Sequence, residues 1–191
     1  VACNTATTNA IALLRETYDV PFIGIEPATK PAAIATKTGK IGILATKGTL
    51  ASELFLNTSK QFRGDVEIIE TVGTGLVQLI EANRMSDCRS LLVEYLDPMV
   101  NAGVDSIVLG CTHYPFLRPI MKEILPDHIS IIDSGEAVAK YTKNVLEKME
   151  REGNDSNAPS HAFYTNGDIA VLQSFVKAIN VDIGISKKME F

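Results

Sequence analysis

The chain has 191 residues, of which 46% are hydrophobic and 21% charged, and its formal net charge at pH 7 is −5. This is the composition of an ordinary globular protein with one or two domains, and it excludes a disordered or fibrous chain. Because there is no basic stripe for phosphates and no apolar run near the roughly 20 residues that span a bilayer, we expect a cytoplasmic protein with a small-molecule partner, no nucleic acid and no membrane.

Short apolar runs rich in β-formers alternate with longer segments of helical period. This alternation is typical of βα units around a parallel sheet, so the predicted fold class is α/β. Strands are expected over residues 21–25, 40–44, 66–70, 106–109, 130–133 and 162–165. Helices are expected over residues 7–17, 50–62, 76–82, 88–101, 117–125 and 136–151, the last with Ser134 as its N-cap.

Two breaks in the pattern bracket a middle domain. Two prolines follow the first expected strand within residues 26–31, and a second break lies at Ser134 and Gly135. A polar cluster at residues 153–160 is typical of a surface loop. Since the chain opens with Val1 rather than Met and leads directly into a motif, we expect the natural protein to begin further upstream.

The first motif places a thiol, Cys3, directly before the helix expected over residues 7–17. A helix N-terminus offers unpaired N–H groups and the positive end of the helix dipole. Both lower the pKa of a cysteine and can hold a carboxylate. Asn4 and Thr5 add neutral hydrogen-bond donors, so this segment predicts a reactive thiol beside an anion site.

The second motif, Gly-Cys-Thr-His-Tyr-Pro at residues 110–115, follows the strand expected over residues 106–109. In open α/β sheets ligands bind beyond the carboxyl ends of the strands, so Cys111 lies where a substrate is expected. His113 is either a structural histidine or a proton-transfer partner tuned near neutral pH. Cys88 lacks such a context and is interpreted as a small buried hydrophobe.

The remaining chemistry-bearing residues predict neither a metal nor a cofactor. Three cysteines without CxxC spacing fit neither a disulfide scaffold nor a zinc site. No glycine-rich phosphate loop and no lysine in a recognisable cofactor motif is present. His128 and His161 lie in loop-like surroundings and are given no role.

In combination, Val-Ala-Cys-Asn-Thr-Ala at residues 1–6 and the motif at residues 110–115 resemble glutamate racemases of the aspartate/glutamate racemase superfamily. The resemblance extends through residues 42–46 and 163–168. Related aspartate racemases show Gly-Cys-Thr-Glu at the second site, so His113 points to glutamate. The resemblance implies two similar α/β domains with mainly parallel sheets flanked by helices, an active site in the cleft between them, no cofactor, and a homodimer.

The layout of the family assigns residues 27–133 to the second domain, and residues 1–26 together with 134–191 to a remnant of the first. The family begins with an Asp-Ser-Gly strand and a Pro-Tyr-Gly segment, and neither precedes Cys3 in this sequence. The Asp-Ser-Gly at residues 133–135 follows both cysteines, so we interpret it as a coincidental match to the N-terminal motif of the family. We therefore expect an incomplete first domain and little or no racemase activity from these 191 residues alone.

Racemisation removes the Cα proton on one face of the amino acid and returns a proton on the other, which two opposed thiols can do. The resemblance implies that Cys3 takes the proton from D-glutamate and Cys111 from L-glutamate, yielding D-glutamate for peptidoglycan. His113 would assist Cys111, and Glu81 matches an acidic residue of the family near this site, although it also fits a solvated helix end. The same match assigns substrate binding to Asn4, Thr5, Thr46, Thr49 and Thr112.

Several alternatives stay open. Thr46 and Thr49 are also ordinary turn residues near a strand end. A Cys-His acyl-transfer enzyme would use Cys111 and His113 but leave Cys3 unexplained. A non-catalytic protein that binds glutamate or modulates DNA topology, derived from a racemase, would retain the thiols without the reaction.

Overall fold

The computed structural model describes residues 1–62, 64–149, 161–178 and 185–189. The chain forms two compact units, Val1–Lys148 and Met149–Phe191. The predicted division into residues 27–133 and a domain made of the two chain ends stays a prediction. Within the described residues, no helix combines the length and apolar character needed to cross a membrane.

The first unit is built on a four-stranded parallel sheet with the order β2-β1-β3-β4. The inner strands are buried almost throughout, because helices cover both faces of the sheet. Ala45, at the end of β1, lies opposite Val72 of β2 and Gly110 of β3, so three strands end at one edge. The strand bounds are β1 (Lys40–Ala45), β2 (Glu67–Val72), β3 (Ser106–Gly110) and β4 (Ser130–Ile132).

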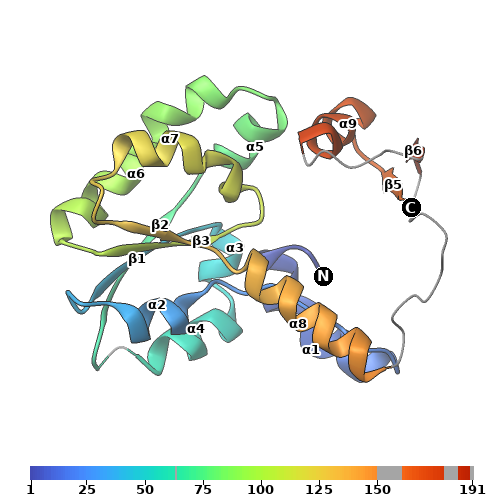
Figure 1. The fold of residues 1–191 in the computed structure, drawn as a ribbon, viewed down its shortest axis with the longest axis horizontal. Helices are drawn as coiled ribbons and strands as arrows, with labels where there is room; N and C mark the ends of the chain where they lie inside the picture. Colours follow the sequence, from blue (N-terminus) through green and yellow to red (C-terminus); the bar gives the residue numbers. More distant parts are fainter. Residues whose placement is uncertain (63, 150–160, 179–184, 190–191) are drawn as a thin grey trace. The chain divides into compact units, whose positions relative to one another are not determined.

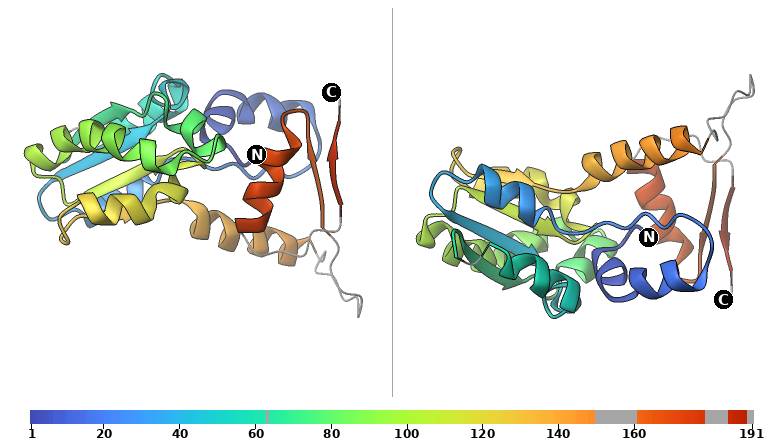
Figure 2. Two further views of the ribbon diagram at one scale, coloured as in Figure 1. Left: turned by 90° about the horizontal axis from the view of Figure 1, so that it is seen from above. Right: turned by 90° about the horizontal axis from the view of Figure 1, so that it is seen from below.

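Helices lie on both faces of this sheet. Figure 1 shows α6 (Cys88–Ala102) and α7 (Arg118–Ile124) on one face, and α2 (Thr29–Ala35) and α4 (Glu53–Lys60) on the other. Figure 2 views the sheet from these two sides. The other helices of the unit are α1 (Asn4–Thr17), α3 (Lys47–Leu50), α5 (Leu76–Glu81), α8 (Gly135–Lys148) and the short 3₁₀ helices η1 (Met85–Asp87) and η2 (Tyr114–Leu117).

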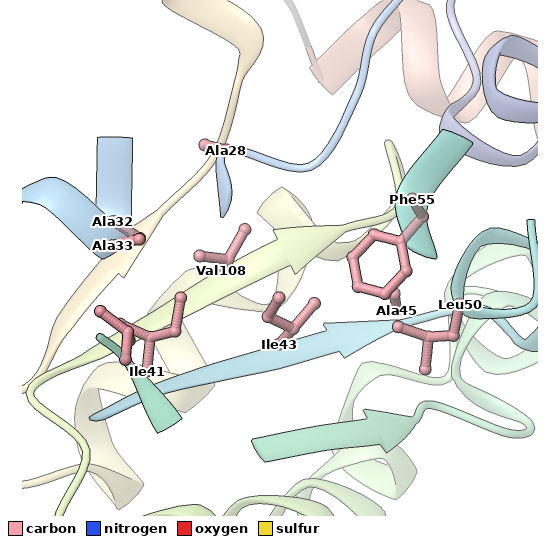
Figure 3. Packing of buried hydrophobic residues seen from close by; sticks show 10 residues of the cluster. Ala28, Ala32, Ala33, Ile41, Ile43, Ala45, Leu50, Phe55 and Val108 are labelled. Atoms are coloured by element: carbon pink, nitrogen blue, oxygen red, sulfur yellow. The ribbon is translucent and has the colours of Figure 1, made fainter. Parts of the chain in front are cut away.

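The core on the α2 and α4 face is a cluster of aliphatic side chains together with the ring of Phe55 (Figure 3). Its buried members are Ala28, Ala32, Ala33, Ile41, Ile43, Ala45, Leu50, Phe55, Val66 and Val108. On the opposite face, a Cβ added to Gly42 would lie 2.5 Å from Met99 Sδ. A glycine in β1 therefore lets α6 pack closely against the sheet.

The second unit is described over one strand–helix–strand segment. β5 (Ala162–Thr165) pairs in parallel with β6 (Ile185–Lys188), and α9 (Ile169–Ala178) lies between them in sequence. Both units thus contain parallel strands joined through helices, and the predicted α/β class with mainly parallel sheets flanked by helices is confirmed. The loop expected at residues 153–160 lies outside the described residues.

Five of the six expected strands are confirmed, but the strand expected over residues 21–25 is wrong. This segment is extended without forming a ladder, and its backbone is bonded to groups of the N-terminal segment instead. The Val1 amino group donates to Ile23 O at 2.6 Å, Arg15 to Phe22 O at 3.0 Å, and the N–H of Ile25 to Thr7 Oγ1 at 3.1 Å.

The expected helices are confirmed, except that one is interrupted and one has a different cap, and the expected end of the last at residues 150–151 lies outside the described residues. The helix expected over residues 50–62 is interrupted at Ser52, whose side chain accepts from Phe55 N and so caps α4. Ser134 precedes α8, but its hydroxyl bonds to Glu26 O, and the Asp133 carboxylate accepts from Gly135 N instead. No expectation covered α2, η1, α9 or β6, and α3 and η2 precede the helices expected from residues 50 and 117.

Candidate functional site

The candidate site lies at the carboxyl edge of the four-stranded sheet. From β1 the chain passes to β2 on one side, and from β2 it crosses to β3 on the other side of β1. Ligands of open α/β sheets bind at such a switch point, beyond the carboxyl ends of the strands. Thr46 follows β1 and Cys111 follows β3, so the register places both at this point.

Cys111, His113 and Glu81 form a connected row at this edge. Cys111 Sγ lies 3.8 Å from His113 Nδ1, and His113 Nε2 lies 2.9 Å from Glu81 Oε1. Glu81 is the last residue of α5, 32 positions before the histidine. A hydrogen bond from Nε2–H to the carboxylate leaves the lone pair of Nδ1 facing the thiol, which suits the histidine to exchange a proton with Cys111.

The Cys111 thiol is buried, with 8% of the residue exposed. Burial raises the pKa of this thiol, and a negative charge on Cys3 or Glu81 raises it further. The backbone N–H groups of His113 and Tyr114 act against these effects by favouring the thiolate.

Cys3 occupies the N-cap of α1, the position expected for it. Its backbone is extended, with φ −154° and ψ 125°, and its Sγ accepts from Ala6 N at 3.5 Å. The side chain is exposed, unlike that of Cys111. Residues 1–3 form no strand, so only the helix half of the expected strand–thiol–helix pattern is seen.

Three threonine hydroxyls join the start of α1 to the loop after β1. Thr5 Oγ1 lies 2.7 Å from Thr46 Oγ1 and 3.1 Å from Thr49 Oγ1, and the last two lie 3.0 Å apart. Thr46 also caps α3 by accepting from Thr49 N at 3.2 Å. These bonds tie Cys3, two residues before Thr5, to the sheet edge that carries Cys111.

The remaining predicted binding residues flank the two thiols. Asn4 is buried, and among the described atoms its Nδ2 has no hydrogen-bond partner. A buried amide without a partner costs free energy, which a bound carboxylate oxygen would offset. Thr112 is half-buried between Cys111 and His113. The structure thus gathers every predicted site residue around the start of α1 and one sheet edge.

Residues outside this group behave differently. Cys88 is fully buried in α6, where burial raises its thiol pKa and its Sγ lies 3.8 Å from Arg84 O. His128 and His161 are exposed. In the part of the chain that the structure describes, no three His, Cys, Asp or Glu side chains gather as metal ligands.

Sequence reasoning did not single out the groups that hold the turn between β2 and α5, the helix that ends at Glu81. The Tyr114 hydroxyl donates to Gly73 O at 3.0 Å, and that of Tyr95 to Thr74 O at 2.9 Å. One indication in the sequence that Tyr114 matters for the site is that it belongs to the second cysteine motif at residues 110–115. Its partner lies 41 residues earlier, a separation that no periodicity reports.

A family model for Asp/Glu/hydantoin racemases matches residues 1–142 of the chain. The glutamate racemase of Pseudomonas putida (strain W619) is 43% identical over 182 residues, which cover 94% of this chain and 68% of the relative. That of Stutzerimonas stutzeri (strain A1501) is 44% identical over 171 residues, or 88% and 64% of the two chains. The chain spans about two thirds of the length of these relatives.

Solved structures of glutamate racemases are also similar to the chain. An isoform from Bacillus anthracis matches with a TM-score of 0.83 at 27% identity, covering 100% of this chain and 73% of the other. The Escherichia coli enzyme, in complex with L-glutamate and the activator UDP-MurNAc-ala, matches with a TM-score of 0.83 at 30% identity, covering 99% and 72%.

Proposed function

The chain belongs to the Asp/Glu/hydantoin racemase family, and from this membership we propose that it interconverts L-glutamate and D-glutamate without a cofactor, through two cysteine bases. The relatives at 43–44% identity are glutamate racemases, which supports glutamate as the substrate. The observations that support the mechanism are the row of Cys111, His113 and Glu81, and the hydrogen bond of Thr5 to Thr46, which ties the helix start beside Cys3 to the same sheet edge.

In the L-to-D direction, the Cys111 thiolate removes the Cα proton. The Cys3 thiol then delivers its own proton to the opposite face of the carbanion, which leaves D-glutamate, a Cys111 thiol and a Cys3 thiolate. The D-to-L direction runs the same transfers in reverse. Because burial raises the pKa of Cys111, its thiolate is a stronger base than an exposed one, which suits it to a weakly acidic C–H bond.

His113 keeps Cys111 ready for this transfer. With Glu81 accepting from Nε2–H at 2.9 Å, the unprotonated Nδ1 faces Sγ at 3.8 Å as a hydrogen-bond acceptor. The imidazole can therefore take the Cys111 proton before the reaction, and the thiolate that remains then takes up the Cα proton of the substrate. In this scheme Glu81 fixes the tautomer of the histidine and never touches the substrate.

The substrate would lie between the start of α1 and the carboxyl edge of the sheet. Glutamate brings two carboxylates, and the residues proposed to hold it are neutral donors near a helix N-terminus. The buried amide of Asn4, without a partner among the described atoms, supports a polar ligand at this point. The proposed donors are Asn4, Thr5, Thr46, Thr49 and Thr112.

Polarimetry of the chain with each enantiomer tests the activity. We expect little or no racemisation from these 191 residues alone, and whatever change of rotation the chain produces should be lost in Cys3→Ser and in Cys111→Ser. Cys88→Ser is the matched control, because this thiol is buried in α6, and it should racemise normally. Full racemisation by Cys3→Ser or by Cys111→Ser would exclude the two-base mechanism.

One alternative has an observation in its favour, because Cys111, His113 and Glu81 have the order of a thiol acyl-transfer triad. Such an enzyme would form a thioester on Cys111. Mass spectrometry of the protein after incubation with activated acyl esters would detect the added mass. Acylation confined to Cys111, without any racemisation, would favour this alternative.

We propose that the cellular role is to supply D-glutamate to peptidoglycan, as a cytoplasmic homodimer. The resemblance to glutamate racemases supports this role. Growth of a bacterial strain that requires external D-glutamate tests it: any growth without D-glutamate that expression of the chain permits should be lost when Cys111→Ser is expressed instead. Analytical ultracentrifugation would give the oligomeric state, for which we expect twice the mass of one chain.

A further inference from the structure

The turn between β2 and α5 is held from two sides by tyrosine hydroxyls. Tyr114 Oη donates to Gly73 O at 3.0 Å, and Tyr95 Oη donates to Thr74 O at 2.9 Å. The two tyrosines come from η2 and α6, so the turn is tied to two other elements. Gly73 N in turn donates to Ala45 O, at the end of β1, at 2.9 Å.

The Tyr114 contact is tight as well as polar. The ring is fully buried and packs directly on Gly73, where an added Cβ would collide with the hydroxyl oxygen and lie 2.9 Å from Cζ. Burial, and then the charge of Cys111, raise the pKa of the Tyr114 phenol. The hydroxyl therefore stays protonated, and stays a donor to Gly73 O, throughout the range in which the protein would work.

The same tyrosine also closes the turn that carries the thiol, because its backbone N–H donates to Cys111 O at 3.1 Å. From Gly73 the chain leads into α5, and Glu81 ends this helix of six residues, which is about 9 Å long at 1.5 Å per residue. Glu81 then reaches back to His113. A closed ring of contacts thus runs from Cys111 through Tyr114, the turn and α5 to Glu81 and His113.

We propose that Tyr114 is a positioning residue, whose hydroxyl anchors the start of α5 so that Glu81 at its end meets His113 and keeps Nδ1 directed at Cys111. This inference rests on the proposed function for its kinetic test. It assigns to the second cysteine motif a role beyond the thiol and the histidine. A short helix of six residues anchored at its first turn can move little at its last one.

Tyr114→Phe removes the hydroxyl and keeps the ring. We expect kcat/KM for racemisation to fall about tenfold, the size of one lost hydrogen bond. The decisive comparison is a double-mutant cycle with Glu81→Gln. If the hydroxyl acts through Glu81, Tyr114→Phe should change kcat/KM less than about twofold once Glu81 is already replaced. Tyr141→Phe, an exposed tyrosine of α8, is the control and should match the unmodified chain.

A second measurement does not require turnover. Alkylation of each cysteine by iodoacetamide, followed across pH by peptide mass spectrometry, reports thiol access and ionisation separately. Because the imidazole that takes the thiol proton would be less well directed, Tyr114→Phe should slow the alkylation of Cys111, leave that of Cys3 unchanged, and lose this effect when Glu81 is glutamine. Absence of racemisation by the unmodified chain would bear on the proposed function and not on Tyr114, whose role the alkylation cycle would then decide.

The proposal would be overturned if Tyr114→Phe lowered kcat/KM equally in the unmodified chain and in Glu81→Gln. It would also be overturned if Tyr114→Phe had no effect in either measurement. Should Tyr114→Phe fail to fold by circular dichroism, Tyr95→Phe takes its place in the same cycle, because this hydroxyl holds the neighbouring carbonyl of the turn. We expect the same direction of change and the same dependence on Glu81. Additive effects of Tyr95→Phe and Glu81→Gln would likewise contradict the role of the turn.

Discussion

At the scale of single residues, the two thiols differ in their surroundings although their motifs look alike. Cys3 is exposed at a helix N-cap, whereas Cys111 is buried behind a histidine and a carboxylate. A pair of bases that serves both directions of one reaction needs no identical environments, since the two enantiomers present their Cα–H bonds to different faces of the site. The asymmetry gives Cys111 a distinct dependence on pH.

This asymmetry predicts a loss of stability in alkaline solution. The folded protein binds the Cys111 proton more tightly than the unfolded chain, because burial raises this pKa above its ordinary value of 9.0. The resulting stability is complete below pH 9 and is lost as pH rises through the raised pKa. Urea unfolding of the chain and of Cys111→Ala between pH 7 and 10.5 measures it. The free energy of unfolding should fall less steeply with pH in the variant, and parallel slopes would contradict the raised pKa.

The site was predictable at this scale only in part. Cys3 and Cys111 could be located because a thiol beside a helix start or a strand end is a local pattern, read from a few neighbouring letters. The contact of His113 with Glu81, 32 residues apart, depends on how α5 is placed after β2. Only the family resemblance pointed to Glu81, and nothing local pointed to the bond between Tyr114 and Gly73.

At the scale of elements, close approach of backbones at the sheet edge sets a packing limit. A Cβ added to Gly110, the last residue of β3, would lie 2.5 Å from Ala45 Cβ and 3.3 Å from Pro27 Cγ. The strand therefore cannot accept even a methyl group without displacing β1. Because Cys111 comes next in the chain, such a displacement would also move the thiol.

Gly110→Ala should accordingly destabilise the protein by about 1–3 kcal/mol, as overpacked cores do. Gly64→Ala is the matched control, because no atom lies within 4 Å of its added Cβ, and its effect should stay within about 0.5 kcal/mol. Chemical denaturation of both variants compares them directly. Equal stabilities of the two variants would show that the edge of the sheet is not closely packed.

Strands were predicted correctly where the apolar run also pairs with a neighbouring strand. The runs that became β1 and β3 are buried strands of the sheet, as expected. The run at residues 21–25 is equally apolar, but a strand requires a ladder, and this segment bonds to Val1 and to side chains of α1. α2 was missed because Pro31 was interpreted as a break, although proline is well tolerated in the first turn of a helix.

At the scale of the whole molecule, the unit Val1–Lys148 contains both thiols and every candidate binding residue. The family model matches nearly this range, residues 1–142. Substrate binding can therefore be measured on the chain separately from turnover.

We expect L-glutamate and D-glutamate to raise the melting temperature, because a ligand that binds only the folded state stabilises it. At a hundredfold excess over Kd, the gain in the free energy of unfolding is about 2.7 kcal/mol. L-Alanine, which lacks the second carboxylate, should give a smaller shift in differential scanning fluorimetry. Equal shifts with glutamate and with sodium chloride at matched ionic strength would show that no specific site is present.

The most direct measurement is Cα hydrogen exchange in deuterated water, followed by proton NMR, for the separate variants Cys3→Ser and Cys111→Ser. If one sulfur stands on each face of the substrate carbon, the variant that keeps Cys111 should exchange L-glutamate only, and the variant that keeps Cys3 should exchange D-glutamate only. Exchange of both enantiomers by either variant would contradict two opposed thiol bases.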